Sequence, residues 1–164
     1  MHDSPSPDSV STDSALDRAI ALAARNVADG GGPFGAIVVA PDGREFAGVN
    51  RVTRDNDPTA HAEVVAIRIA ARELGTFDLT GCVLYASCEP CPLCLSAALW
   101  ARLDRVEFAA DRHDAARAGF DDAVFYDLFD TPRDQWPTRV EQAPSASAAA
   151  PFDAWRENAE RVEY

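Results

Sequence analysis

Apolar residues recur at helical spacing near the start of the chain, over residues 16–27. They are Leu16, Ile20, Ala23, Ala24 and Val27. Ser11, Thr12 or Asp13 can cap a helix with this pattern, and Gly30 can end it. The pattern therefore predicts an amphipathic helix from about residue 13 to Gly30.

A β-hairpin is predicted next. The apolar run 36–40 and the segment 44–50 flank Pro41-Asp42-Gly43, a turn-forming sequence. Because the run 36–40 has no polar alternation, we expect its strand to be covered on both faces.

Strands and helices alternate over the following sixty residues. A polar stretch, 51–60, leads into a helix that begins around His61 and is closed by Gly75. A strand over 82–87, a helix from the segment 89–94 through Leu103 and a strand over 105–110 follow. This alternation predicts an α/β sandwich.

The last third of the chain gives weaker patterns. We expect helical pieces over 111–118 and 124–129, a short strand over 138–141 and a final helix from about Pro151 to Tyr164.

Length and composition place these elements in one domain. A chain of 164 residues with 47% hydrophobic content can bury a proper core, and no apolar run approaches the roughly 20 residues that span a bilayer. Residues 1–12 are rich in Ser, Pro and Asp and lack the features of a secretory signal, so we interpret them as a disordered tail. The domain is expected to cover 13–150, followed by a C-terminal helical segment, 151–164. We expect a cytoplasmic protein without membrane contact.

The chain is strongly acidic, with 27 acidic and 15 basic residues and a formal net charge of −12. Every basic residue is Arg, which excludes a Schiff-base lysine, a P-loop lysine and a lysine general base. Nucleic-acid binding depends on neutralising phosphates, so the charge argues against a nucleic-acid partner.

The four cysteines lie close together, between Cys82 and Cys94. Such clustering favours a metal site over disulfides spread through the chain. A catalytic zinc takes three protein ligands and leaves one position open, and His61, Cys91 and Cys94 supply one such set. We therefore expect one Zn²⁺ per chain, at the converging N-termini of two helices whose free N–H groups favour anionic sulfur.

Glu63 points to catalysis at this metal. A carboxylate beside a zinc-bound water can take its proton and pass it to a substrate nitrogen. The combination of H-x-E with P-C-x-x-C is the zinc deaminase signature.

Other uses of these residues stay open at this point. Cys82 or Cys88 can in principle complete a four-ligand structural zinc site in a noncatalytic binding module. A disulfide redox protein using Cys91 and Cys94 is a further alternative, but it gives His61 and Glu63 no shared purpose.

The segments 61–63 and 88–94 resemble the cytidine deaminase-like superfamily, and the whole region from about residue 14 to 130 is similar to it. The resemblance implies a three-layer α/β/α sandwich with a five-stranded mixed sheet, usually in dimers or larger assemblies. A homodimer is therefore expected, with C-terminal segments that fold back or cross to the neighbour.

Within this superfamily, the segments 31–36 and 118–122 and a chain that ends in Tyr164 look most like bacterial guanine deaminases. That group converts guanine, a small purine base, to xanthine and ammonia. The resemblance implies that Asp122 acts as a second acidic group near the leaving amine. It also implies substrate-binding roles for Asn50, Phe34, Ala62, Trp100 and Tyr164.

These roles have simpler competitors. Asn50 can just end a strand, Phe34 and Trp100 can belong to the core, and Tyr164 can be a frayed terminus. Guanosine, cytosine, an aminotriazine and an adenosine in tRNA remain alternative substrates.

Overall fold

The computed structural model describes residues 14–164. The predicted tail, 1–12, and the three residues expected to cap the first helix lie outside this range. The first helix, α1 (Ala15–Ala28), is instead capped by Ser14, whose hydroxyl accepts a hydrogen bond from the backbone N–H of Asp17. The Asp17 carboxylate accepts the Ser14 N–H in return, which completes a capping box.

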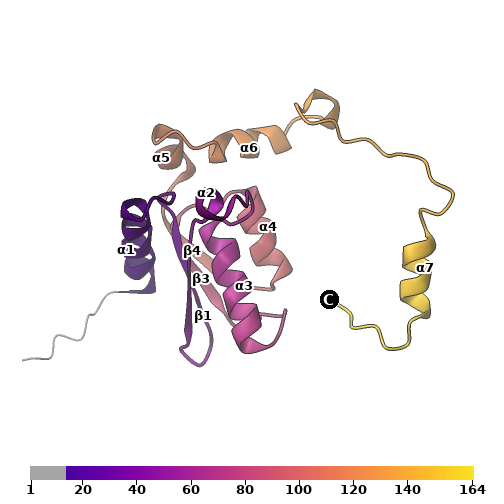
Figure 1. Cartoon of the computed structure of the whole chain (residues 1–164), viewed down its shortest axis with the longest axis horizontal. Helices are drawn as coiled ribbons and strands as arrows, with labels where there is room; N and C mark the ends of the chain where they lie inside the picture. Colours follow the sequence, from indigo (N-terminus) through magenta and orange to yellow (C-terminus); the bar gives the residue numbers. More distant parts are fainter. Residues whose placement is uncertain (1–13) are drawn as a thin grey trace, which may run out of the picture.

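One mixed sheet forms the centre of the domain (Figure 1). Its strands are β1 (Gly35–Val39), β2 (Glu45–Val49), β3 (Val83–Cys88) and β4 (Arg105–Ala110). They lie in the order β2-β1-β3-β4, with β3 and β4 parallel and the other pairs antiparallel. The hairpin prediction is confirmed, and β1 is buried on both faces as its apolar run indicated.

Helices cover both faces of the sheet (Figure 1). α1 lies on one face, and α3 (Ala62–Leu74) lies on the other with α4 (Pro92–Trp100) beside it. Gly75 ends α3 in the left-handed conformation, at φ 70°, as predicted from the sequence. The α/β/α sandwich class is thus confirmed.

Two strand glycines bring the helices unusually close to the sheet. A Cβ at Gly48 would lie 2.2 Å from the carbonyl oxygen of Ala62 and 2.5 Å from the backbone nitrogen of Ala66, both in α3. A Cβ at Gly35 would lie 2.4 Å from the carbonyl oxygen of Ala19 in α1. These contacts leave no room for any side chain, so the glycines fix how near each helix sits.

The expected fifth strand is absent from residues 14–164, where the sheet has four strands. The segment 138–141, expected as a short strand, is irregular and exposed. It follows Pro137, and Val140 is its one apolar residue, so it has little surface to bury against a sheet. A short helix that the sequence did not predict, α2 (Val52–Asp55), lies in the polar stretch before His61.

The C-terminal third departs from the compact body (Figure 1). α5 (Arg112–Arg117) and α6 (Asp122–Phe129) lie above the sheet, and η1 (Arg133–Gln135) follows them. An extended segment then leads to α7 (Ala150–Glu157), which stands apart from the domain, while the chain end turns back toward it. α7 ends at Glu157, so the final helix is shorter than the sequence pattern predicted.

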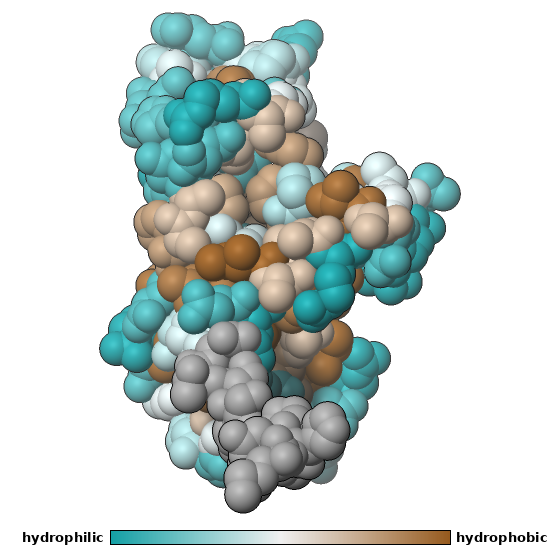
Figure 2. All heavy atoms as spheres, turned by 90° about the vertical axis from the view of Figure 1, so that its left-hand side faces the viewer, coloured by the Kyte–Doolittle hydropathy of each residue, from teal (hydrophilic) through white to brown (hydrophobic). Residues whose placement is uncertain are grey.

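The outer side of α1 is partly apolar. Figure 2 shows a band of hydrophobic residues across this side of the molecule, with more hydrophilic surface above it, and α1 exposes Ile20 and Val27. Among residues 14–164, no helix is both long enough and apolar enough to cross a membrane.

The contact at Gly48 gives a test of the fold. Gly48→Ala is expected to lower the free energy of unfolding by about 1–3 kcal/mol, because the new methyl group must push α3 away from β2. Denaturant unfolding followed by circular dichroism measures this loss. Ala47→Thr, on the exposed neighbouring position of β2, is the control and should change stability by less than about 0.5 kcal/mol. Equal midpoints for the two variants would contradict the close approach.

Candidate metal centre and active site

The N-termini of α3 and α4 meet at one point. His61 is the N-cap residue of α3, Cys91 is the N-cap residue of α4, and Cys94 lies in the first turn of α4. Pro92 follows Cys91 at the first helical position, where its missing N–H has no intrahelical partner to lose. His61, Cys91 and Cys94 form a cluster whose ligand atoms all lie within 4.8 Å of one another.

The spacing of this cluster matches a tetrahedral zinc site. Nδ1 of His61 lies 3.5 Å from Sγ of Cys91 and 3.4 Å from Sγ of Cys94, and the two sulfurs are 3.7 Å apart. Ordinary zinc bond lengths at tetrahedral angles place N and S about 3.6 Å apart and two S atoms about 3.8 Å apart. One imidazole and two sulfurs are also a known ligand set for catalytic zinc, so these residues fit the metal.

At this distance the contact between the two thiols shifts their pKa values in opposite directions. The contact with Cys94 lowers the pKa of Cys91 to about 4, although burial opposes the shift. The same contact, together with burial, raises the pKa of Cys94. Both sulfurs lie at a helix N-terminus, where free N–H groups stabilise negative charge, so a cation can hold both as thiolates.

Cys82 and Cys88 are not part of this cluster. Both are buried thiols, and Cys88 donates to the carbonyl oxygen of Asp111 at 3.6 Å. Burial raises the pKa of Cys88 to about 11, which keeps its thiol protonated. The described residues therefore offer three protein ligands and leave a tetrahedral metal one open position.

Glu63 lies beside the ligands in the first turn of α3. Its side chain is 6% exposed, and Oε2 lies 3.4 Å from Sγ of Cys94. Burial raises the pKa of Glu63 to about 7. A carboxyl group that titrates near neutral pH can both accept and return a proton, as general acid–base catalysis requires.

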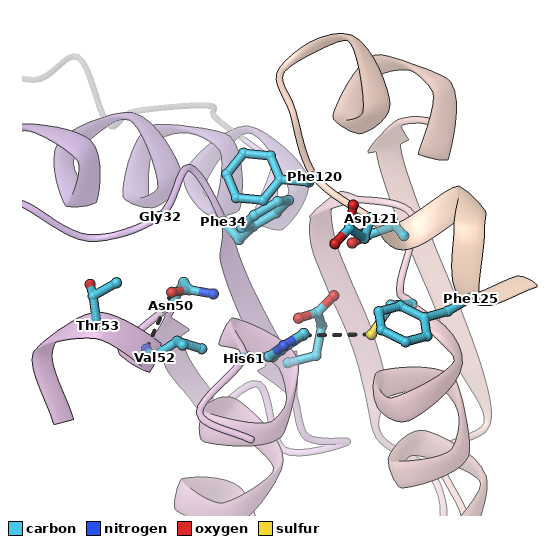
Figure 3. Close-up of a pocket in the computed structure, with 12 residues that line it drawn as sticks. Gly32, Phe34, Asn50, Val52, Thr53, His61, Phe120, Asp121 and Phe125 are labelled. Atoms are coloured by element: carbon cyan, nitrogen blue, oxygen red, sulfur yellow. Dashed lines mark hydrogen bonds between the residues drawn. The ribbon is translucent and has the colours of Figure 1, made fainter. Parts of the chain in front are cut away.

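A cavity of about 270 Å³ opens over the cluster (Figure 3). Its lining residues come from five parts of the chain: Gly32, Phe34, Asn50, Val52, Thr53, His61, Glu63, Cys91, Phe120, Asp121, Asp122 and Phe125. The ring of Phe120 packs edge-on against Phe34 at a centroid distance of 4.8 Å. This pair joins the glycine-rich loop, residues 30–34 between α1 and β1, to the α5–α6 connection across the top of the cavity (Figure 3).

Asn50 and Asp122 provide polar groups at the cavity wall. Asn50 is 8% exposed, and its Oδ1 accepts the Val52 N–H at 3.3 Å, which directs its Nδ2 into the cavity (Figure 3). Asp122 is half-buried, and burial raises the pKa of its carboxyl above the usual range. Asp121 is the N-cap residue of α6 but makes no side-chain capping bond, and it also lines the cavity.

The loop before α4 is fixed by a network that involves α5 and α6. Glu89 binds Arg112 through both carboxylate oxygens, at 2.5 Å and 3.0 Å. The Arg112 guanidinium lies 3.5 Å above the ring of Tyr126, whose hydroxyl donates to the carbonyl oxygen of Pro90 at 2.7 Å. Glu89 and Pro90 lie within two residues of Cys91. The network therefore fixes the position of this candidate metal ligand and links it to α6.

Three of the residues assigned to substrate binding do not line this cavity in the single chain. Ala62 is fully buried between His61 and Glu63. Trp100 and Tyr164 lie together in a separate hollow of about 580 Å³ beside α7, with their ring centroids 6.3 Å apart. Within one chain, then, the structure brings Asn50, Phe34, Glu63 and Asp122 to the metal ligands but leaves Tyr164 elsewhere.

Several lining residues were not singled out from the sequence. Val52 and Thr53 belong to the unpredicted α2, and Phe120 and Phe125 approach only through tertiary packing. The one local signal is Gly119, whose φ of 91° turns the chain just before Phe120 and Asp121.

Residues 10–110 match the family model described as the cytidine and deoxycytidylate deaminase zinc-binding region. The chain belongs to this zinc-dependent deaminase family. A guanine deaminase from Bacillus subtilis is 48% identical over 150 residues, which cover 91% of this chain and 96% of that protein. Its crystal structure superposes with a TM-score of 0.87 over 92% of this chain and 96% of that one.

Two further relatives are more distant. The structure of a guanine deaminase from Nitrosomonas europaea is 30% identical, with a TM-score of 0.62 over 78% of this chain and 66% of that one. A tRNA-specific adenosine deaminase from Buchnera aphidicola is 35% identical over 96 residues, 58% of this chain and 64% of that protein. The matched family is zinc-binding, and in this chain His61, Cys91 and Cys94 are arranged to hold a metal ion.

Metal analysis of purified variants tests the ligand set. The wild-type protein is expected to hold about one zinc per chain, since one three-ligand cluster is present. His61→Ala, Cys91→Ser and Cys94→Ser should each lose most of this zinc, as measured by atomic emission. Cys88→Ala is the matched control and should retain it, because Cys88 lies outside the cluster. A loss with Cys88→Ala as large as with Cys91→Ser would indicate a closed four-ligand site.

Proposed function

We propose that the protein catalyses hydrolytic deamination of guanine to xanthine and ammonia. The observation that carries the proposal is Glu63, a buried carboxyl group beside a three-ligand zinc cluster at the floor of a small cavity. The two guanine deaminases among the relatives support the same substrate.

Each part of the site has a place in this reaction. Zinc, when bound, lowers the pKa of a water and makes it nucleophilic near neutral pH. Glu63 accepts a proton and returns it to the substrate, a transfer for which its pKa of about 7 is suited. Phe34 and Phe120 keep bulk water from the upper part of the cavity.

The polar groups of the wall suit a purine base. Guanine presents donors and acceptors on one edge, and Nδ2 of Asn50, which points into the cavity, donates to an acceptor of the base. Asp122 also lines the cavity, where its carboxylate accepts from an exocyclic amine. The cavity of about 270 Å³ is near the lower end of the roughly 300–1,000 Å³ range of ligand pockets, which favours a free base. The net charge of −12 disfavours tRNA.

A substrate panel with a Glu63 variant tests this proposal. Wild-type protein should release ammonia from guanine faster than from guanosine, cytosine, an aminotriazine or tRNA. Glu63→Gln should keep about one zinc per chain and lose about 10²–10⁴-fold in kcat, because the amide cannot carry the proton. Zinc-loaded Glu63→Gln with wild-type turnover would refute the mechanism. A preference for tRNA would refute the substrate.

We further propose that the protein acts as a homodimer with exchanged C-terminal segments. Large apolar side chains are exposed on α4 and α6, among them Leu99 at 68%, Val124 at 60% and Phe129 at 60%. Exposed apolar surface of this kind marks an interaction site. α7 adds Phe152 and Trp155 and is carried away from its own domain on an extended segment (Figure 1).

A groove next to the active site offers a place for the exchanged segment. It is a mostly apolar hollow of about 450 Å³ whose walls include Leu93 and Phe129. It shares His61, Cys91, Asp122 and Phe125 with the catalytic cavity. A Tyr164 delivered there from a second copy closes the open side of the site. In this arrangement 13–150 is the deaminase domain and 151–164 completes the site of the neighbour.

Removal of the segment tests its role. Deleting 151–164 is expected to reduce guanine turnover at least about tenfold while zinc stays near one per chain, because no metal ligand lies in the segment. Kinetics equal to those of the full chain would remove Tyr164 from the site.

Co-expression of two impaired variants distinguishes C-terminal segments that cross between subunits from segments that fold back on their own chain. Full-length Glu63→Gln supplies C-terminal segments, and the deletion variant supplies intact Glu63 centres. Activity should return on co-expression when segments cross between subunits, and should stay lost when each segment serves its own chain.

The proposal includes a cytoplasmic location, where the thiolate ligands of a zinc site stay reduced.

A further inference from the structure

Asn26 occupies a position on α1 that its helical pattern would give to an apolar residue. It follows Ala19 and Ala23 on the face of α1 that packs against the sheet, and these three are the buried residues of the helix. Asn26 is only 2% exposed. A buried amide is costly unless all its polar atoms are paired, so its partners explain why it is there.

Every partner of the Asn26 amide belongs to the wall of the catalytic cavity or to the helix that forms part of it. Nδ2 donates to the carbonyl oxygen of Gly32 at 2.8 Å and to that of Asn50 at 2.9 Å. Oδ1 accepts from Nη2 of Arg54 at 2.9 Å. Gly32 and Asn50 line the cavity, and Arg54 follows Val52 and Thr53, which also line it.

The glycine-rich loop fits tightly around this amide. Gly31 donates its N–H to the backbone oxygen of Asn26 at 2.8 Å, and a Cβ at Gly31 would lie 2.3 Å from Nδ2 of Asn26. A Cβ at Gly32 would lie 3.0 Å from Oδ1 of Asn50. The loop, Asn26 and Asn50 are therefore packed as one unit without space for other side chains.

The backbone of Asn50 is held on both sides. Its N–H donates to the carbonyl oxygen of Phe34 at 3.1 Å, and its carbonyl oxygen accepts from Asn26. With Oδ1 bound by the Val52 N–H, the side-chain amide has one orientation, and its Nδ2 points into the cavity. Asn26 thus fixes the residue that presents the amide to a ligand.

Arg54 selects the orientation of Asn26. A flipped amide would place Oδ1 against two carbonyl oxygens and the NH₂ group against a guanidinium, and both contacts are repulsive. The bond from Arg54 to Oδ1 therefore keeps both N–H donors on Gly32 and Asn50.

From these contacts we propose that Asn26, oriented by Arg54, is a positioning residue that sets the Asn50 subsite for the purine. The role rests on the proposed function, in which Asn50 binds the base. Because Asn50 holds substrate before and during the reaction, its displacement weakens binding more than it slows chemistry.

Asn26→Asp is the sharpest variant, since it keeps the side chain's shape and removes both donors. We expect the KM for guanine to rise about tenfold with kcat changed less than about twofold, and zinc content to stay the same. Arg54→Ala should raise KM about threefold. Because Arg54 is exposed, this variant tests the same orienting contact if Asn26→Asp does not fold. Arg68→Ala, an exposed arginine on α3 paired with Asp57, is the matched control and should leave KM unchanged.

A double-mutant cycle separates positioning from simple packing. In an Asn50→Ala background, Asn26→Asp and Arg54→Ala should change KM less than about twofold, because no amide remains to be oriented. A lower melting temperature with unchanged KM, or the same KM increase in both backgrounds, would overturn the proposal.

The dissociation constant of hypoxanthine, a purine without an amine to lose, gives a second readout by calorimetry. Across the same double-mutant cycle, this dissociation constant should change in the same way as the KM for guanine. Absence of ammonia release from guanine by the wild-type protein would refute the proposed function alone, while the hypoxanthine cycle would still decide the role of Asn26.

Discussion

Close contact between helix backbones and strand glycines is the constraint on which the active site depends. At Gly48 the backbone of α3 lies where a side chain would otherwise be, and at Gly35 the backbone of α1 does the same on the opposite face. The helix residues that face the sheet are small: Ala19, Ala23, Ala62, Ala66 and Ala70 are all at most 6% exposed. The contact at Gly48 involves Ala62, the residue between His61 and Glu63. The distance between sheet and helix therefore sets the positions of His61 and Glu63 relative to the sheet.

The same packing resolves an electrostatic problem. A chain with a net charge of −12 places two thiolate ligands and a carboxyl group in one buried site. The N-termini of α3 and α4 both point at this site, and their free N–H groups stabilise negative charge. Burial raises the pKa of Glu63 to about 7, so this group can hold a proton instead of adding a further charge.

Local rules explain which parts of the structure the sequence predicted. The H-x-E and C-x-x-C spacings place ligands at helix starts, and turn chemistry marks both the hairpin and the end of α3 at Gly75. The metal centre and most of the sandwich were therefore predictable. Residues that reach the site through tertiary contacts were harder to find. Val52 and Thr53 lie on a four-residue helix without periodicity, and Asn26 sits in an otherwise ordinary amphipathic pattern.

The expectations that failed or stay untested concern elements without a partner inside one chain. The fifth strand came from resemblance, and the segment 138–141 has no neighbour to pair with. The last helix stops at Glu157, where the backbone of Asn158 turns extended, at φ −73° and ψ 105°. Tyr164 lies beside Trp100 and does not line the cavity over the metal ligands of its own chain. Sequence pattern predicts what a segment can bury, but not the surface against which it is buried.

The metal ligands and most of the cavity walls belong to different parts of the molecule. The ligands and Glu63 belong to α3 and α4, which are locked to the sheet, whereas the cavity walls come from α2, the glycine-rich loop and the α5–α6 connection. Two sets of side-chain contacts join these parts. Asn26 ties the loop and Asn50 to α1, and the Glu89–Arg112–Tyr126 network ties α5 and α6 to the loop that carries Cys91. Since each wall is anchored within a few residues of a fixed element, the residues that line the cavity keep their positions relative to the metal ligands even though they lie on short and irregular segments.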